Sequence, residues 1–353
     1  MVRIELIPGD GIGVDVTAEA AKVLNCVADE AGLSLELVEW DLGAERYLRT
    51  GSAITDDEMA ELKSDYDAIF LGAIGDPRVP SNEHARQILL GLRFKLDLYI
   101  NLRPVKLYET RLSPLKDVTP DDVNLIVFRE NTEGAYVGMG GVFKEGTPDE
   151  IAIEEDVNTR KGAERIIRAA FEYAERTGRK KVTLSDKANA MRYGGGLYRR
   201  TFKDVGIEYS GIEQNAVYAD ALALDLVLHP SKYDVIVAPN LFGDILSDLA
   251  AALVGGLGLA PSASLHPGKT GLFEPVHGSA PDLVGTRRAN PLAAVLTAAL
   301  MLEHLGHAGI AAGVERAVMK AVQSGNTTPD LGGELDTVAV GDWVCREIRE
   351  SGL

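Results

Sequence analysis

Apolar positions along the chain recur with two different spacings. Short runs rich in β-branched and aromatic residues, such as VRIELI at 2–7 and YDVIVA at 233–238, have the length and composition of buried strands. Each is followed by a glycine-rich or polar turn and then by a segment whose apolar residues repeat with helical spacing. Strands that alternate with helices in this way are typical of an α/β fold.

The same pattern recurs in YDAIFLGAIG at 66–75 and in KKVTLSDKAN at 180–189. A helix is expected over 14–32, where helical spacing ends at a glycine. Further helices are expected over these ranges: 83–95, 159–177, 194–204, 214–228, 241–253, 291–305 and 309–323.

The segment 136–157 differs from its surroundings because it is rich in glycine and only weakly alternating. It fits an extended hairpin or arm better than a helix, and such an arm could reach a second subunit. The chain shows no internal repeat, low-complexity tract or flexible linker. Two domains, if present, are therefore expected to be interleaved.

Composition narrows the class of protein. A chain of 353 residues with 46% hydrophobic and 25% charged residues is expected to form one large or two medium α/β domains. The net charge of −17 provides no general basic field, so nucleic acid and anionic membranes are not expected partners. No secretion signal opens the sequence, and the apolar run at 292–302 is too short to span a membrane. Cys26 and Cys345 form no disulfide framework, which fits inert thiols in a reducing cytoplasm.

The run NLFGDILSDL at 240–249 places Asp244 and Asp248 one helical turn apart. Between 233 and 268 there is no Lys or Arg, and Asp234 is the only other formal charge. The two aspartates either form the polar face of an amphipathic helix or hold a cation, because like charges at this spacing repel each other. Oxygen ligands without Cys or His at suitable spacing favour Mg²⁺ or Mn²⁺ over zinc.

Basic residues upstream and downstream could complete a site for an acidic substrate. Arg93 lies near a helix end, Arg103 in a strand and Arg129 in the strand-like segment 123–131. A guanidinium group matches a carboxylate at two points, so converging arginines suit a dicarboxylate, although each could also form a structural ion pair. Lys187 follows a buried-looking strand, at the strand end where α/β proteins usually form sites. A neighbouring metal would lower the pKa of Lys187 and make it a base. The alternative is an ordinary surface lysine.

Seven segments complete the set of motifs: GDGIG (9–13), LDLYINLRP (96–104), FRENTEGAY (128–136), SDKAN (185–189), NLFGDILSDLAA (240–251), GLGLAPSAS (256–264) and EPVHGSAPD (274–282). In content and order they resemble the β-decarboxylating dehydrogenases, the family of isopropylmalate, isocitrate, homoisocitrate and tartrate or malate dehydrogenases. The resemblance covers essentially the whole chain.

The family resemblance implies two interleaved domains that share a large mixed β-sheet flanked by helices. A discontinuous cofactor-binding domain would comprise 1–98 and 255–353, and a substrate, metal and dimerisation domain would comprise 99–254. The arm at about 136–157 matches the family's intersubunit clasp. A homodimer with active sites shared between the subunits is therefore expected.

The same resemblance assigns the catalytic chemistry. Asp244 and Asp248 are expected to bind Mg²⁺ or Mn²⁺ together with Asp220 of the partner subunit. Lys187 of the partner subunit would remove the proton of the substrate hydroxyl, and Tyr136 would supply a proton after decarboxylation. Three arginines would hold the substrate carboxylates: Arg93, Arg103 and Arg129.

The expected cofactor is NAD. GDGIG is a weak dinucleotide signal because its spacing is GxGxG, and it also fits a simple tight turn. By resemblance the cofactor lies against the loop at 274–282, near Ile12. The matching contact residues are Glu274, His277, Gly278, Ala280 and Asn290. Asp282 can accept a hydrogen bond from a ribose 2′-hydroxyl and repels a 2′-phosphate, although Arg287 and Arg288 lie close to it in sequence.

The expected substrate is 3-isopropylmalate of leucine biosynthesis. Leu89 and Leu90 stand where isocitrate enzymes carry polar groups, and burying an isopropyl group is worth roughly 1.5 to 3 kcal/mol. Arg86 stands where many isopropylmalate enzymes carry a glutamate, which leaves tartrate, D-malate or homoisocitrate as alternatives. The two leucines could also be ordinary core residues. A catalytically silent regulatory subunit is disfavoured because Lys187, Tyr136 and the three acids are all retained.

Overall fold

The computed structural model describes residues 1–353, which form two compact units. Unit 1 comprises Met1–Leu98, Lys106–Asp121 and Ala251–Leu353. Unit 2 comprises Tyr99–Val105 and Asp122–Ala250. The segments 106–121 and 251–254, which the sequence assigned to the second domain, group with unit 1.

Unit 1 is built on five strands in the order β2-β1-β3-β12-β11. Their bounds are β1 (Val2–Gly9), β2 (Leu35–Glu39), β3 (Ala68–Ala73), β11 (Pro261–Leu265) and β12 (Gly271–Pro275). β1 pairs in parallel with β2 and β3, and β12 pairs in parallel with β3 but antiparallel to β11. All of β3 is buried, as its continuous apolar sequence AIFLGA predicts for a central strand.

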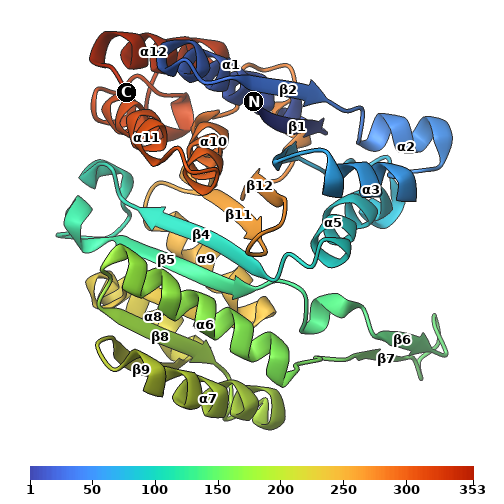
Figure 1. Ribbon diagram of the computed structural model, residues 1–353. Helices are drawn as coiled ribbons and strands as arrows, with labels where there is room; N and C mark the ends of the chain where they lie inside the picture. Colours follow the sequence, from blue (N-terminus) through green and yellow to red (C-terminus); the bar gives the residue numbers. More distant parts are fainter. The chain divides into compact units, whose positions relative to one another are not determined.

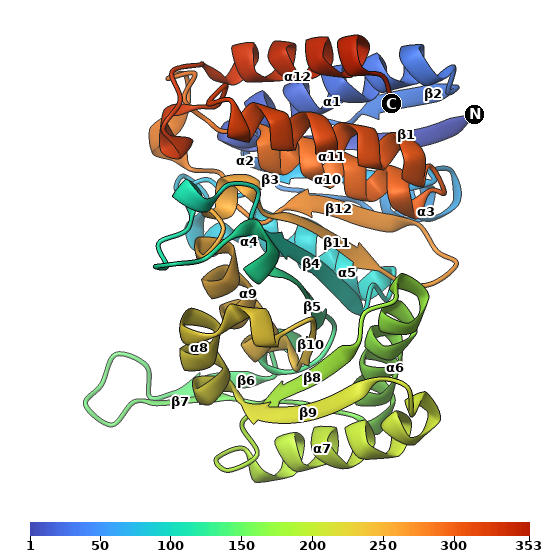
Figure 2. The same cartoon turned by 90° about the vertical axis from the view of Figure 1, so that its left-hand side faces the viewer.

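The helices of unit 1 form layers on its strands. They are α1 (Ile12–Ala31), α2 (Ala44–Thr50), α3 (Asp56–Ser64), α4 (Glu83–Ala85), α5 (Gly91–Lys95), α10 (Leu292–His304), α11 (Ala308–Gln323) and α12 (Thr337–Ser351). A π-helical segment, Arg86–Leu90, joins α4 to α5. α1 packs on β1 and β3, α10 packs on β11 and β12, and α12 packs on α1 and α11 (Figures 1 and 2).

Both cysteines lie in unit 1 and are buried. The Cys26 thiol on α1 donates to the carbonyl oxygen of Cys345 on α12, at 3.5 Å. The thiols are thus neighbours in space although they stand at opposite ends of the sequence.

Unit 2 carries the remaining five strands of the ten-stranded sheet, in the order β4-β5-β10-β8-β9. Their bounds are β4 (Ile100–Lys106), β5 (Asn124–Glu130), β8 (Lys181–Asp186), β9 (Glu213–Tyr218) and β10 (Val235–Ala238). β5, β10, β8 and β9 are parallel neighbours. The α/β prediction with a large mixed sheet flanked by helices is confirmed, and the ten strands are divided equally between the units.

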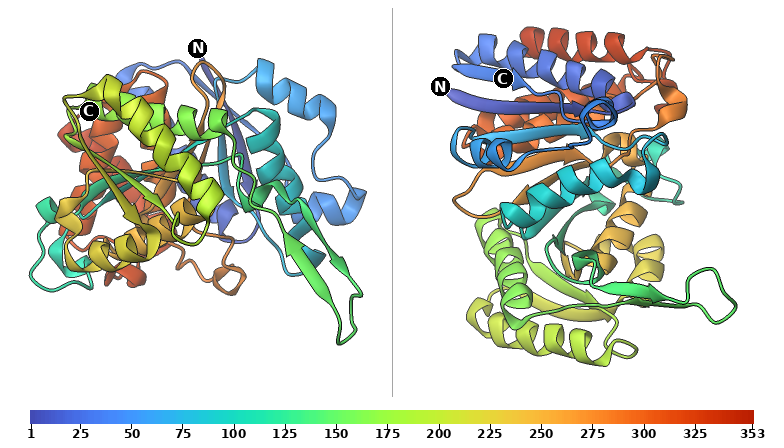
Figure 3. Two further views of the ribbon diagram at one scale, coloured as in Figure 1. Left: turned by 90° about the horizontal axis from the view of Figure 1, so that it is seen from below. Right: turned by 90° about the vertical axis from the view of Figure 1, so that its right-hand side faces the viewer.

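Four helices cover the strands of unit 2: α6 (Arg160–Thr177), α7 (Arg192–Gly206), α8 (Ala219–Leu228) and α9 (Asn240–Ala252). α6 packs on β5, β10 and β8 and carries α7 beside it, whereas α8 packs on β8 and β9 from the other face (Figures 1 and 2). The glycine-rich segment forms the antiparallel hairpin of β6 (Gly140–Phe143) and β7 (Ile151–Glu154), as predicted. This hairpin extends away from the remainder of unit 2, and all its strand residues are exposed (Figure 3).

The helix expected over 214–228 is wrong in its first part. Residues 213–218 form β9, and the helix begins only at Ala219. β9 is an edge strand with no buried residue, so it lacks the apolar alternation that marks a strand in sequence. Its pairing with β8, a contact distant in sequence, determines its conformation. None of the helices in either unit has the length and apolarity needed to cross a bilayer.

Candidate active site

The acidic run at 240–249 forms α9, as predicted, directly after the buried strand β10. Gly243 permits α9 to approach β5 closely, because a Cβ at this position would lie 2.7 Å from the Cβ of Arg129. The close approach brings the helix face with Asp244 and Asp248 against side chains of β4 and β5. A small residue in α9 thereby sets the geometry of the site.

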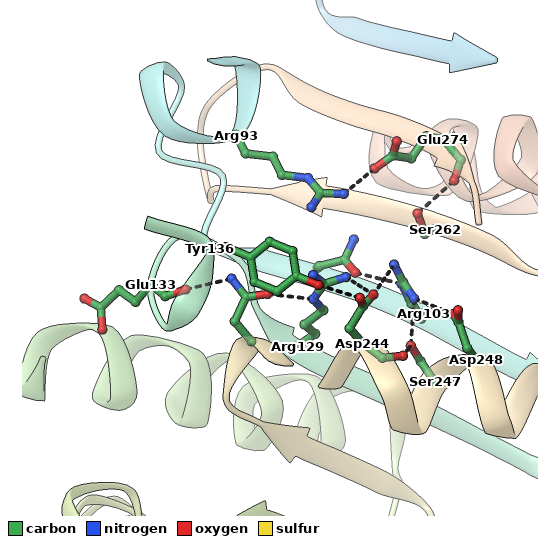
Figure 4. A network of polar contacts seen from close by, with 12 residues as sticks. Arg93, Arg103, Arg129, Glu133, Tyr136, Asp244, Ser247, Asp248, Ser262 and Glu274 are labelled. Carbon is green, nitrogen blue, oxygen red and sulfur yellow. Dashed lines mark hydrogen bonds and ion pairs between the residues drawn. The ribbon is translucent and has the colours of Figure 1, made fainter. Parts of the chain in front are cut away.

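Arg129 and Tyr136 meet at Asp244. The buried guanidinium of Arg129 forms an ion pair with one carboxylate oxygen of Asp244, and the Tyr136 hydroxyl donates to the other at 2.6 Å (Figure 4). Arg129 also donates from Nε to Oδ1 of Asn240 at 2.9 Å. Its guanidinium carbon lies 4.9 Å from the centroid of the Tyr136 ring. These contacts hold Arg129 and Tyr136 in fixed orientations.

Arg103 connects the two aspartates from β4. Its Nη1 donates to Oδ1 of Asp248 at 3.0 Å and to Oγ of Ser247 at 2.8 Å, and its Nη2 lies 3.3 Å from Oδ1 of Asp244 (Figure 4). Burial raises the pKa of Asp248, an effect that Arg103 opposes and Asp244 reinforces. The aspartates lack cations nearby in sequence, but the fold supplies two arginines from strands more than a hundred residues away.

This acidic pair has the donor chemistry of a site for Mg²⁺ or Mn²⁺. Asp244 and Asp248 present carboxylate oxygens from one helix face, with the Ser247 hydroxyl beside them and neither Cys nor His in the contacts. Hard divalent cations prefer such oxygen ligands. No group of three or more His, Cys, Asp or Glu side chains within the chain could hold a metal ion. One chain therefore provides two of the three expected acids at this place.

The third acid, Asp220, lies beside Lys187 instead. The Lys187 ammonium and Oδ1 of Asp220 are 2.5 Å apart, and the hydrogen bond from Lys187 lowers the pKa of Asp220. The Asp220 side chain keeps 68% of its surface exposed. A small pocket beside Lys187 is lined in part by Asn158 and Phe242. The predicted base and the third acid thus form a pair at the surface of unit 2.

Arg93, the third predicted substrate arginine, belongs to unit 1. It is buried on α5, and its Nη2 donates to Oε1 of Glu274 on β12 at 2.7 Å (Figure 4). Ser262 of β11 supports this strand end by donating from its hydroxyl to the carbonyl oxygen of Glu274 at 2.8 Å. A predicted substrate contact and a predicted cofactor contact are therefore direct partners.

Both predicted pocket leucines, Leu89 and Leu90, are half-buried. Leu89 packs against the buried core of unit 1. Arg86, at the start of the π-helical segment, is exposed and forms no ion pair. Arg86 is thus more accessible to a ligand than either leucine.

The loop at 274–282 lies against the GDGIG turn. The Ile12 amide donates to the carbonyl oxygen of Ser279 at 2.8 Å. Gly11 has φ +60°, and a Cβ there would lie 2.1 Å from the same carbonyl oxygen, so the contact requires glycine. The ring of His277 approaches the carbonyl oxygen of Gly278 at 3.0 Å, and burial lowers the pKa of His277. Ala280 adopts φ +38°, an uncommon conformation for a residue with a Cβ.

The remaining predicted cofactor residues flank this loop. Asn290 is buried, accepts from the Leu292 amide at 3.0 Å and donates to Asp330 at 2.9 Å. Asp282 is exposed, as are Arg287 and Arg288. The Arg287 guanidinium pairs at 3.5 Å with Asp336 rather than with Asp282.

Two polar residues of the network were missed by the sequence reasoning. Asn240 orients Arg129 and accepts its hydrogen bond, while its own amide donates to the carbonyl oxygen of Glu133 at 2.9 Å. Ser247 accepts from Arg103. The signal for Asn240 was present, because it lies four residues before Asp244 and therefore on the same helix face.

Comparison with known proteins relates this arrangement to characterised families. Residues 3–344 match the family described as isocitrate/isopropylmalate dehydrogenase. The chain is 46% identical over 353 residues to a 3-isopropylmalate dehydrogenase of Thermobifida fusca, with 99% of both proteins covered. It is 47% identical over 352 residues to a 3-isopropylmalate dehydrogenase of Corynebacterium glutamicum, covering 99% of this chain and 100% of that protein.

Solved structures agree with these sequence matches. The crystal structure of isocitrate dehydrogenase from Methylococcus capsulatus is similar with a TM-score of 0.90 and 38% identity, covering 99% of this chain and 100% of that one. The TT0538 protein from Thermus thermophilus is similar with a TM-score of 0.85 and 33% identity, covering 98% of this chain and 68% of that one. The chain belongs to the isocitrate/isopropylmalate dehydrogenase family.

Proposed function

We propose that the protein oxidatively decarboxylates (2R,3S)-3-isopropylmalate to 4-methyl-2-oxopentanoate and CO2 with NAD⁺, as a step of leucine biosynthesis. The observation that carries this proposal is the cluster in which Asp244 and Asp248 face Arg103, Arg129 and Tyr136. The names of relatives at 46–49% identity support the choice of substrate.

The acidic face of α9 would hold the metal. We assign Asp244 and Asp248 to one Mg²⁺ or Mn²⁺, completed by Asp220 of the partner subunit. When bound, the ion would supply Lewis-acid chemistry by drawing negative charge onto the oxygen of the developing ketone and enolate. NAD⁺ would supply the hydride acceptor.

The side chains of the chain perform the binding and proton transfers. Arg103 and Arg129 offer guanidinium groups for the two substrate carboxylates, and Asn240 fixes the plane of Arg129. Lys187 of the partner subunit accepts the proton of the substrate hydroxyl at Nζ. Tyr136 donates its hydroxyl proton to the carbon that has lost CO2, which completes the proton balance.

Unit 1 is the proposed cofactor-binding domain. Ile12 and the loop at 274–282 would form the surface against which the nicotinamide nucleotide lies, with Asn290 at its edge. Asp282 favours NAD⁺ over its 2′-phosphorylated form because it can accept from the ribose hydroxyl. Arg287 pairs with Asp336, which supports this preference.

The assembly we propose is a homodimer. Apolar side chains lie exposed in the arm and on two neighbouring helices of unit 2. They are Met139, Val142, Phe143, Ile151 and Ile153 of the arm, Leu224, Val227 and Leu228 of α8, and Leu241 and Ile245 of α9. Burial against a second copy would remove this surface from water and bring the Lys187–Asp220 pair of one chain toward the acids of the other.

The proposed function is tested by a substrate comparison. Purified protein with NAD⁺ and Mn²⁺ is assayed with 3-isopropylmalate, isocitrate, homoisocitrate, tartrate and D-malate side by side. We expect the highest kcat/KM for 3-isopropylmalate, since Leu90 offers an apolar contact to its isopropyl group. A preference for another acid would change the substrate assigned to the protein, although it would remain in the same family. In that case the exposed guanidinium of Arg86 favours homoisocitrate or malate as the substrate.

A variant of the proposed base tests the mechanism. Lys187→Met should abolish turnover with all of these acids while the protein still folds and dimerises. The matched control is Lys203→Met, since Lys203 is exposed on α7 and forms no ion pair. Unchanged turnover of Lys187→Met would remove this lysine from the mechanism. A protein that binds NAD⁺ but turns over no acid at all would be a regulatory subunit instead.

A further inference from the structure

The proposed base and the third acid leave the ends of two neighbouring strands. β8 and β9 are parallel, and their register pairs Asp186 with Tyr218 at their last residues. Lys187 follows Asp186 directly, and Asp220 lies in the first turn of the helix that follows Tyr218. The relative position of Lys187 and Asp220 therefore depends on how these two strand ends are held.

Asp186 fixes the turn that carries Lys187. Its side chain is 0% exposed, and its Oδ1 accepts from the Ala188 amide at 2.6 Å, which closes a turn around Lys187. The carbonyl oxygen of Lys187 in turn accepts from the amide of Met191 at 2.7 Å. A buried carboxylate of this kind needs a cationic partner.

Arg199 on α7 is that partner, and it also reaches the second strand end. Its Nε donates to Oδ2 of Asp186 at 2.7 Å, and its guanidinium carbon lies 4.4 Å from the centroid of the Tyr218 ring. One planar group thus contacts the residue before Lys187 and a residue two positions before Asp220. Arg199 forms no hydrogen bond or ion pair with Lys187 or Asp220 itself.

We propose that Arg199 is a positioning residue that fixes Lys187 and Asp220 relative to each other, so that a subunit presents the base and the third metal ligand as one rigid pair. This inference rests on the proposed roles of Lys187 and Asp220. The ion pair of Arg199 with Asp186 lies in unit 2 but outside the cluster around Asp244. Its proposed function is to position the residues that unit 2 supplies to the active site of the partner subunit.

The first experiment compares three variants of the dimeric enzyme. Arg199→Met should lower kcat by about 30-fold, because a displacement of about 1 Å at a reacting group reduces the rate by up to about a hundredfold. The KM for NAD⁺ should stay unchanged, and the Mn²⁺ concentration for half-maximal rate should rise. Arg199→Lys should recover part of kcat, since it keeps the charge but loses the planar contact. Arg200→Met, at the exposed neighbouring position, should match the wild type.

The outcomes decide the role of Arg199. Wild-type kcat and Mn²⁺ dependence in Arg199→Met would overturn the proposal. If Arg199→Met does not fold, the decision passes to Arg199→Lys, whose folded protein should lose severalfold in kcat. Wild-type kinetics of that variant, or an equal rise in the KM for NAD⁺, would contradict a positioning role.

A second experiment separates this proposal from the proposed function. Hybrid dimers are purified in which one chain carries Arg199→Met and the other Asp244→Asn. If Lys187 and Asp220 act on the site of the partner, one of the two sites in this hybrid contains only native residues, and about half of the wild-type activity should return. A hybrid of Lys187→Met with Asp244→Asn serves as the reference. If that reference hybrid stays inactive, the proposal that two subunits share an active site is refuted. If the reference hybrid is active while Arg199→Met alone has wild-type kcat, only the positioning role of Arg199 is refuted.

Discussion

Glu5 provides a quantitative test of the packing of unit 1. It lies on the central part of β1, between Val38 of β2 and Ile69 of β3, and is 0% exposed. Neither carboxyl oxygen has a partner with full hydrogen-bond geometry, and Tyr66 provides only a weaker polar interaction. Burial, the largest cause, raises the pKa of Glu5 from 4.5 to about 9, although Tyr66 opposes this shift. The folded protein therefore holds Glu5 protonated at neutral pH.

The raised pKa makes stability depend on pH in a defined direction. Below pH 4.5 the carboxyl is protonated in both states, so burial carries no ionisation penalty. Between pH 4.5 and about 9 the unfolded chain releases the proton while the folded chain retains it, and stability falls as pH rises. Each pH unit above 4.5 removes roughly 1.4 kcal/mol of stability, so the free energy of unfolding at pH 7 is about 3 kcal/mol lower than it is below pH 4.5.

Glu5→Gln should remove this pH dependence, because the amide stays neutral. Its melting temperature relative to the wild type should rise between pH 5 and 9, by about 1 to 2 °C per kcal/mol for a chain of 353 residues. Differential scanning calorimetry at fixed protein concentration and scan rate measures the difference at each pH. The control is Glu39→Gln, an exposed position on neighbouring β2. Parallel profiles for Glu5→Gln and the wild type over this range would refute the reasoning.

Two further predictions concern the cofactor loop and the thiols. Gly11→Ala should raise the KM for NAD⁺ by about tenfold or more, because the new Cβ would meet the Ser279 carbonyl oxygen and displace the loop at 274–282. The control Gly309→Ala on α11 meets no atom and should leave the KM unchanged. Equal KM values for the two variants would contradict a role of this loop in binding NAD⁺. Burial raises the pKa of Cys345 to about 12, so Cys345 should not react with a disulfide reagent at pH 8 within minutes. Cys26 should be equally slow because its side chain is buried out of reach of the reagent, and both thiols should react in urea. Rapid labelling of the folded protein would show that α1 and α12 separate readily.

Much of the fold was predictable because its elements have strong local patterns. β1, β3, β8 and β10 are apolar runs, and the glycine-rich arm stood out by composition. α12 was not predicted, and Gly341 within it lowers local helix propensity. The reason for that glycine is tertiary: a Cβ there would lie 1.8 Å from the carboxylate of Glu19 on α1. A residue that weakens the local signal permits the close packing of two helices.

The site was predictable in its acids and not in its ion pairs. The spacing of Asp244 and Asp248 predicted that both acids lie on one helix, where they form its polar face or hold a cation. The pairing of these acids with Arg103 was not, because Arg103 lies 145 residues from Asp248 in sequence. The contact of Arg199 with Asp186 and Tyr218 depends likewise on strand register, which no local pattern encodes.

The packing of α1 on α12 has a consequence for synthesis on the ribosome. α1, whose buried residues include Val16, Val23 and Val27, emerges early, but α12, which packs on it, is among the last segments made. At about 5 to 20 residues per second, the roughly 300 intervening residues delay α12 by about 15 to 60 s. Over that interval the nascent chain exposes an uncovered helix face, so general chaperones that bind apolar segments should associate with it before release and leave once the carboxyl-terminal helix docks.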